Sequence, residues 1–185
     1  MHGCGEDVVL VDCIRQPLAV QADLPRLASR CLERGSGVGG TALLLAGPGS
    51  TDGRLSARSF EPDGAEADPS GHALRCVARY ATDAGLVSST TFLVETRRGD
   101  VRAEAIDSRN IRLDLGAPVS PEAAAEIRES PAGVFTAAIE VEGRLLTYTP
   151  VSVGTAYGVF FVPGFDAATA RTGRRIAKHP GFPHG

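Results

Sequence analysis

Three side chains that could transfer protons lie close together in the segment FEPDGAEADPSGHALRC, residues 60–76. Ser70 stands between a proline and a glycine, Glu66 lies four residues before it, and His72 lies two residues after it. Serine is a preferred helix N-cap, and the backbone N–H groups that follow a cap bind anions readily. The segment therefore predicts a helix that begins at Ser70, with candidate acid/base groups around an anion-binding turn.

Each of these side chains also has a purely structural interpretation. Ser70 can be a cap and nothing more, because Pro-Ser-Gly begins helices that take no part in catalysis. His72 can be exposed to solvent or face a ligand without transferring a proton. Glu66 can be a loop carboxylate that compensates nearby N–H groups. The sequence alone leaves both interpretations open for all three residues.

Composition and motifs argue against several classes of function. The net charge is −3 with acidic and basic residues interspersed, so no basic surface for nucleic acid is expected. Lys178 is the only lysine and lies in a segment typical of an exposed helix end, which argues against pyridoxal phosphate chemistry. Neither a P-loop nor G-x-G-x-x-G is present, and we expect no cofactor. No C-x-x-C pair occurs, which predicts reduced structural thiols and no metal site for the four cysteines, Cys4, Cys13, Cys31 and Cys76.

The sequence also lacks the patterns that bring a protein to a membrane. No run of 18 or more apolar residues occurs. The opening MHGCGEDVV has an acidic pair where a signal peptide would carry basic residues before an apolar run. We therefore expect a soluble, cytoplasmic protein that makes no contact with a membrane.

The elements that must position Ser70 are short strands and two helices. β-Branched or alternating runs bounded by Gly, Pro, Asp or Ser predict strands at 8–12, 41–46, 54–60, 90–96, 101–106 and 111–116. Helices are predicted at 23–35 and at 70–84. In the second helix the charged residues form one stripe at a spacing of four and apolar residues cover the other faces, which is typical of a helix surrounded by sheet. The pattern favours an α+β fold with a mostly antiparallel sheet.

A segment rich in Pro, Ala and Glu divides the chain. We predict a first domain over 1–117, a linker over 118–133 with one short exposed helix, and a second region over 134–185. The second region has two strands around a Glu-Gly turn, a third strand and a helix near its end. About 50 residues of this kind bury too little surface to fold alone, so we interpret the region as part of a larger unit.

Several segments, in order along the chain, resemble the diaminopimelate epimerase family, which isomerises amino acids at Cα without a cofactor. HGCGEDVVLVD at 2–12 is similar to the family's H-G-x-G-N-D-F, and RGSGVGGTALLL at 34–45 to its R-x-x-G-I-G-A-D-G. Residues 60–76 resemble F-N-x-D-G-S-x-A-x-x-C-G-N-G-x-R-C. Further collinear matches are LVETRRGDVRAE, IRLDLGAPV, VSVGTAYGVFFV and KHPGFPHG.

The resemblance implies two pseudo-symmetric halves, each a curved, mostly antiparallel sheet wrapped around a central helix, with the first half complete here and the second partial. It implies a site between the halves, one cysteine from each half, an amino-acid substrate and a place in lysine biosynthesis. A thiol at a helix N-terminus has a lowered pKa, which suits it to remove a Cα proton. Ser70 stands at the position of the first cysteine, and a hydroxyl without a neighbouring base hardly ionises at pH 7.

The resemblance also assigns substrate contacts and partners. The N–H groups of Gly71 and His72 are expected to bind the substrate's α-carboxylate. Glu6, Glu61 and Thr155 stand where the family has asparagine, which favours a cationic over an acidic substrate terminus. The second catalytic group is expected from a missing C-terminal half, from a second chain or from a homodimer.

Three alternatives compete with an active epimerase. The chain could be an inactive homologue or partner subunit that retains an amino-acid-binding cleft. It could be an isomerase of the phenazine-biosynthesis type, because Glu66 with Gly71-His72-Ala73 is similar to that group's E-x-x-x-x-G-H-A; a dry cleft would then raise the pKa of Glu66. It could also be a gene fragment that does not fold stably.

Overall fold

The computed structural model describes residues 1–18, 22–118, 128–129, 135–153 and 156–181. The chain divides into two compact units, Met1–Gly116 and Ala117–Gly185. Most of the linker predicted over 118–133 lies outside the described residues, although Arg128–Glu129 within it form a short strand rather than a helix. No helix in the described part of the chain is long and apolar enough to cross a membrane.

The first unit is built on one eight-stranded sheet. Its strands are β1 (His2–Gly3), β2 (Glu6–Asp12), β3 (Ala42–Pro48), β4 (Arg54–Phe60), β5 (Glu66–Ala67), β6 (Thr91–Thr96), β7 (Gly99–Ala105) and β8 (Ile111–Asp114). They lie in the order β1-β2-β3-β4-β6-β7-β8, with β5 added beside β4. Only the pairs β2–β3 and β4–β6 are parallel. The predicted α+β fold with a mostly antiparallel sheet is therefore confirmed.

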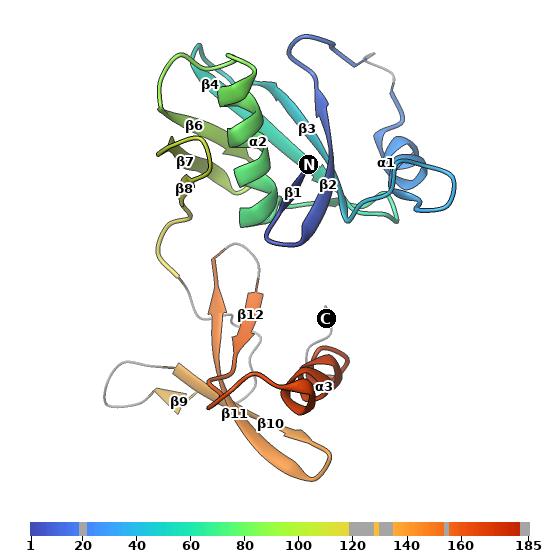
Figure 1. Ribbon diagram of the computed structural model, residues 1–185, viewed down its shortest axis with the longest axis vertical. Coiled ribbons are helices and arrows are strands. Elements are labelled where there is room, and N and C mark those ends of the chain that lie inside the picture. The colour runs from blue at the N-terminus through green and yellow to red at the C-terminus, as the bar shows by residue number, and fades with distance from the viewer. Residues whose placement is uncertain (19–21, 119–127, 130–134, 154–155, 182–185) are drawn as a thin grey trace. The chain divides into compact units, whose positions relative to one another are not determined.

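Helix α2 (Gly71–Asp83) lies inside the curve of this sheet. It contacts β1, β2 and β3 near one edge and β7 and β8 at the other, which requires the sheet to curl around it (Figure 1). Leu74, Val77 and Ala81 of the helix are at most 3% exposed and pack with residues of both edges. The sheet closes around α2 because the helix is apolar on nearly all faces, as its sequence predicted.

Helix α1 (Leu24–Leu32) covers the opposite face of the sheet (Figure 1). Side chains alternate along a strand, so Leu44 of β3 packs in the cluster around α2 while Leu43 and Leu45 pack in the cluster around α1. A strand buried on both faces explains the uninterrupted apolar run ALLLA. This double burial fixes β3 and its neighbour β2, whose first residue is Glu6.

The second unit is a four-stranded antiparallel sheet with one helix. Its elements are β9 (Arg128–Glu129), β10 (Phe135–Val141), β11 (Arg144–Ser152), β12 (Ala156–Val159) and α3 (Ala167–Ile176), and the strand order is β12-β11-β10-β9. Its core is small and includes Tyr148 stacked on Phe160 at 5.2 Å between ring centroids. None of the described residues of α3 is buried.

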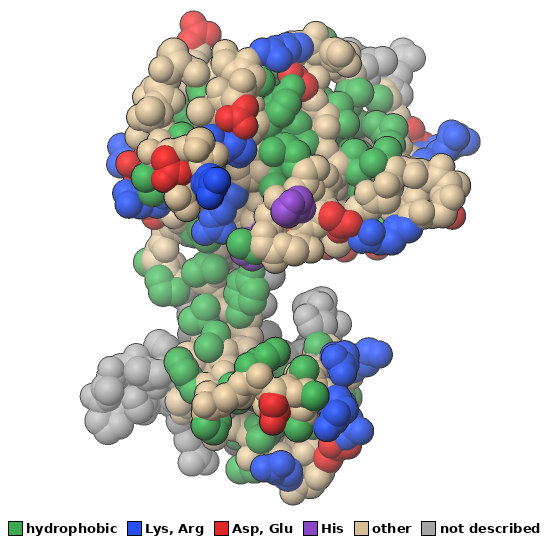
Figure 2. Space-filling view, viewed as in Figure 1, with side chains coloured by type: hydrophobic (Ala, Val, Ile, Leu, Met, Phe, Trp, Pro, Cys, Tyr) green, Lys and Arg blue, Asp and Glu red, His purple; other side chains and the backbone are tan. Residues whose placement is uncertain are grey.

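Large apolar side chains remain at the surface of this unit (Figure 2). Phe161 and Phe165 are 88% and 84% exposed, and Leu145 is 74% exposed. Soluble proteins seldom leave so many large apolar side chains open to water. The described residues of this unit therefore leave much apolar surface outside its core.

Candidate active site at the start of helix α2

Ser70 caps helix α2, as predicted, and its hydroxyl makes two hydrogen bonds. The Ser70 Oγ accepts a bond from the backbone N–H of Ala73 at 3.0 Å. The same hydroxyl donates to the Glu6 Oε2 at 2.6 Å. Both side chains are half-buried. The hydroxyl therefore lies between a helix N-terminus and a carboxylate that could accept its proton.

The hairpin formed by β1 and β2 brings Glu6 to the helix. Its turn is Cys4-Gly5, with φ angles of 52° and 91°, which is the pattern of a two-residue turn that matches the twist of antiparallel strands. Gly3 pairs with Glu6 and lies against the first turn of α2, where an added Cβ would be 3.1 Å from the His72 carbonyl oxygen. A larger residue at Gly3 would push the hairpin, and Glu6 with it, away from Ser70.

Gly71 and His72 lie in the first turn of α2, and Arg75 begins the next turn. The first N–H groups of an α-helix have no partner within the helix, so those of Gly71 and His72 can bind a carboxylate. The Arg75 Nη1 donates to the Gly71 carbonyl oxygen at 3.4 Å and lies 3.4 Å from the His72 Nδ1. These contacts hold a positive guanidinium beside the turn, which further favours an anionic ligand.

Glu66 is tied to a strand rather than to Ser70. The Arg58 Nε and Nη2 donate to the two oxygens of Glu66 at 2.8 and 2.9 Å. The hydrogen bonds from Arg58 lower the pKa of the Glu66 carboxyl against the opposing effect of burial. A dry cleft would have raised this pKa, so the result is opposite to the condition under which Glu66 would shuttle a proton. The bidentate pair keeps Glu66 ionised near neutral pH.

Two arginines of the β6–β7 turn hold the segment that leads into Ser70. The Arg97 Nη1 donates to the Glu66 carbonyl oxygen at 3.0 Å. The Arg98 Nε donates to the Asp68 Oδ2 at 2.5 Å. Asp68 is two residues before Ser70, so these bonds fix the approach of the chain to the helix. The sequence did not predict this contact between the turn and the segment.

The remaining predicted substrate-contact residues are Glu61 and Thr155. Glu61 is exposed in the loop after β4, where its backbone N–H donates to the Ala65 carbonyl oxygen at 2.9 Å. Thr155 lies outside the described residues. The structure brings Glu6, Ser70, Gly71 and His72 together, and the roles of these residues stay predictions, as do those of Glu61 and Thr155.

The cysteines do not add a reactive group to the site. All four are free thiols, and Cys76 is buried in the core, where burial raises its pKa. Cys4 is exposed in the β1–β2 turn. Among the described residues no three His, Cys, Asp or Glu side chains gather as they would to hold a metal ion.

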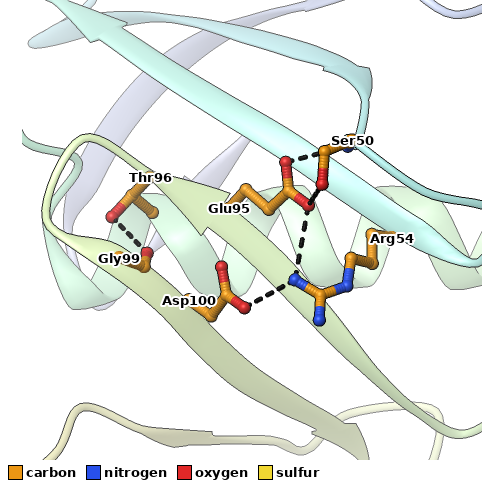
Figure 3. Close-up of polar contacts among 6 residues, drawn as sticks. All are labelled: Ser50, Arg54, Glu95, Thr96, Gly99 and Asp100. Carbon is orange, nitrogen blue, oxygen red and sulfur yellow. Dashed lines mark hydrogen bonds and ion pairs between the residues drawn. The ribbon is translucent and has the colours of Figure 1, made fainter.

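A second polar cluster lies on strands β4, β6 and β7 and on the turn between β3 and β4, as Figure 3 shows. The Ser50 Oγ donates to the Glu95 Oε1 at 2.6 Å, and the Arg54 Nη1 contacts Glu95 at 3.5 Å and Asp100 at 2.6 Å. The bonds from Ser50 lower the pKa of Glu95, with a further contribution from Arg54. Sequence analysis missed this cluster because its members are far apart in the chain and follow no motif.

Comparison with known proteins shows which family the chain belongs to. The family model for diaminopimelate epimerase matches residues 1–120. The chain belongs to the diaminopimelate epimerase family. Its relatives include diaminopimelate epimerases of Pelotomaculum thermopropionicum (36% identical, over 98% of this chain) and Desulforudis audaxviator (37% identical, over 99%). The chain spans 66% of the length of each.

Solved structures support the same fold. A hydroxyproline epimerase from Agrobacterium vitis superposes with a TM-score of 0.58 at 17% identity, covering 86% of this chain and 49% of that protein. A probable proline racemase from Agrobacterium radiobacter gives a TM-score of 0.57 at 19% identity, with the same coverage. The fold expected from the family resemblance is thus confirmed.

Proposed function

We propose that this chain supplies one proton-transferring half of a cofactor-independent amino-acid epimerase or racemase in the cytoplasm. The observation that carries the proposal is the position of Ser70: its hydroxyl caps α2 where the family places a cysteine, and it is hydrogen-bonded to a carboxylate. The substrate class is a zwitterionic amino acid, and the reaction is proton transfer at Cα.

The site offers a binding mode that suits this reaction. The N–H groups at positions 71 and 72 would hold the substrate's α-carboxylate at the helix N-terminus. Their partial positive charge, with that of Arg75 nearby, would stabilise the negative charge that develops on the carboxylate when the Cα proton leaves. Ser70, one residue before these N–H groups, is then placed to exchange that proton.

Inversion needs a second group on the opposite face of Cα. We propose that it comes from the part of the fold that the relatives have and this chain does not span, carried by a continuation of the chain or by a second subunit. One half-site can still exchange the Cα proton with solvent and return it to the same face. Exchange without inversion is therefore the activity expected of this chain by itself.

One observation argues against the isomerase that uses Glu66, and another favours the inactive homologue. An isomerase that uses Glu66 as its acid would need that carboxyl to be neutral, and Arg58 lowers its pKa. The inactive homologue is favoured by one observation, the serine in the cysteine position. Activity in the Ser70→Cys variant separates an inactive chain with an intact pocket from one whose pocket is lost.

Deuterium exchange tests the proposal directly. The purified chain is incubated in deuterated water with diaminopimelate, L-proline or trans-4-hydroxy-L-proline, and loss of the Cα proton is followed by NMR. We expect exchange with at least one amino acid, and loss of that exchange in Ser70→Ala. If neither the natural chain nor Ser70→Cys exchanges any of them, the proposed function is wrong.

A further inference from the structure

A serine in place of a catalytic thiol poses a chemical problem that Glu6 can solve. A hydroxyl is a far weaker acid than a thiol, so Ser70 cannot act as a preformed base near neutral pH. A neighbouring carboxylate can remove the hydroxyl proton at the moment the oxygen takes another. We propose, on the basis of the proposed function above, that Glu6 and Ser70 form a proton relay in which Glu6 is the final base.

The hydrogen bonds of Ser70 leave its oxygen ready to accept a proton. A hydroxyl has one hydrogen and two lone pairs. Its hydrogen points to the Glu6 Oε2, and one lone pair accepts from the Ala73 N–H. The second lone pair has no hydrogen-bond donor among the described residues. That lone pair can take a Cα proton from a substrate bound at the helix N-terminus.

A short serine–glutamate distance is not by itself a sign of this role, because the described residues include three such pairs. Ser36 donates to Glu33 and Ser50 donates to Glu95, both at 2.6 Å like the pair at Ser70. The pair at Ser36 is exposed, at the end of α1. A carboxylate in water gains little from the serine and offers no enclosed site for a substrate.

The pair at Ser50 differs from the pair at Ser70 in charge. Arg54 forms an ion pair with Glu95 (Figure 3), which stabilises the charged carboxylate and makes it a poorer proton acceptor. Within the described residues Glu6 forms no ion pair. Of the three pairs, the Glu6–Ser70 pair alone combines partial burial of both side chains, no paired cation and a helix N-terminus on the hydroxyl oxygen.

The proposed step balances as one concerted transfer. The Cα–H bond of the substrate breaks, and its proton goes to the Ser70 Oγ. At the same time the hydroxyl proton of Ser70 goes to the Glu6 Oε2. The electron pair left on Cα spreads into the substrate carboxylate, which the helix N–H groups bind. Glu6 ends protonated and Ser70 remains a hydroxyl, and the reverse step returns a solvent-derived proton to the same face.

The relay predicts a slower reaction than a thiolate would give. A carboxylate is a weaker base than a thiolate by about 4 pKa units in reference compounds. A thiol at position 70 would not need a carboxylate to accept a second proton, because the thiolate is itself the base. Removal of the Glu6 carboxylate should therefore slow Cα exchange in the serine protein and not in the Ser70→Cys variant. A merely structural role of Glu6 would not produce this difference.

Exchange rates of the natural chain, of Ser70→Cys and of three further variants test this difference, with the amino acid that the natural chain exchanges best. Glu6→Gln keeps the size of the side chain and should slow Cα exchange about 100-fold, the typical contribution of a general base. Glu33→Gln removes the carboxylate of the matched exposed pair and should leave the rate unchanged. Glu6→Gln in the Ser70→Cys background should not slow exchange, because the thiolate is itself the base there. Equal losses in both backgrounds, or no loss in the serine protein, would overturn the relay.

Alkylation of the variant thiol tests the contact without any substrate. A carboxylate beside a thiol disfavours the thiolate, which is the form that iodoacetamide attacks. At pH 7 the Ser70→Cys, Glu6→Gln double variant should therefore react at least threefold faster than Ser70→Cys alone. Equal rates would show that Glu6 does not reach position 70 and would overturn the relay. If instead the natural chain exchanges no amino acid while the thiol senses Glu6, the proposed function fails and the pairing stands.

Discussion

Helices α2 and α3 each lie against the sheet of their own unit but are packed very differently. Six residues of α2 are buried, and strands from both edges of the first sheet contact it. No residue of α3 is buried, and of the described strands β10 makes its main contact. A sheet of eight strands is wide enough to curl around a helix, whereas a sheet of four strands covers one side of it. The number of strands, more than the helix sequence, decides how much apolar surface is removed from water.

The largest effect that would test this comparison is truncation of a helix residue in each unit. Leu74→Ala in α2 removes a side chain that is 3% exposed and should cost about 2–5 kcal/mol of unfolding free energy. Ile176→Ala in α3 removes a half-buried side chain and should cost under about 1.5 kcal/mol. Native-state hydrogen exchange, read separately for amides of each unit, measures both costs. Similar costs in the two helices would contradict the comparison.

Acid should affect the first unit more than the second. Hydrogen bonds lower the pKa of Asp12, chiefly from the Arg15 N–H and also from Tyr80, and those of Glu66 and Glu95 are lowered as well. Within the described part of the second unit, Asp166 alone shows a lowered pKa. A carboxyl whose pKa is lower in the folded state stabilises the fold above its unfolded pKa, about 4, and this stabilisation is lost as the pH falls through the folded value.

NMR spectra recorded between pH 6 and pH 2 would show which unit loses structure first. We expect signals of the first unit to lose dispersion at a lower pH than they do in Asp12→Asn, which lacks the stabilisation that the ionised Asp12 carboxylate gives above its folded pKa. If the substitution leaves the acid transition where it is, hydrogen bonding at Asp12 does not contribute to it.

The smallest effect concerns ion pairs on the surface, which both units have. Arg112 pairs with Glu104 at 2.7 Å in the first unit, and Arg175 pairs with Glu142 in the second. Both pairs are exposed to water, so Arg112→Ala and Arg175→Ala should each cost less than about 1 kcal/mol. Thermal unfolding of the two variants checks this. A large loss in either would show that surface charge, and not apolar burial, separates the units.

The strands and helices of the first unit could be predicted because their patterns are long. The six strands and two helices expected there are present, with ends shifted by a few residues. The sequence did not reveal β1, β5 and β9, which have two residues each and show no periodicity. Such short strands exist only because a neighbouring strand offers backbone partners, a condition that a local pattern cannot express.

The site could be predicted in part for the same reason. Ser70 was found as a cap because Pro-Ser-Gly is a local signal. Its bond to Glu6 depends on the register of the β1–β2 hairpin and on the packing of Gly3 against α2. The bond from Arg58 to Glu66 depends on the pairing of β4 with β5, which places the two side chains diagonally across the pair. Local residue patterns cannot predict contacts that depend on strand register.

The arginine turn between β6 and β7 has a consequence for how this protein can change. Arg97 and Arg98 donate hydrogen bonds to Glu66 and Asp68, just before Ser70. The orientation of the Ser70 hydroxyl therefore depends partly on a turn about 30 residues further along the chain. A related protein with a longer or shorter β6–β7 turn would need a compensating change in the segment that contains Glu66 and Asp68. Substitutions in this turn could thus shift the position of the Ser70 side chain without changing any residue proposed to contact the substrate.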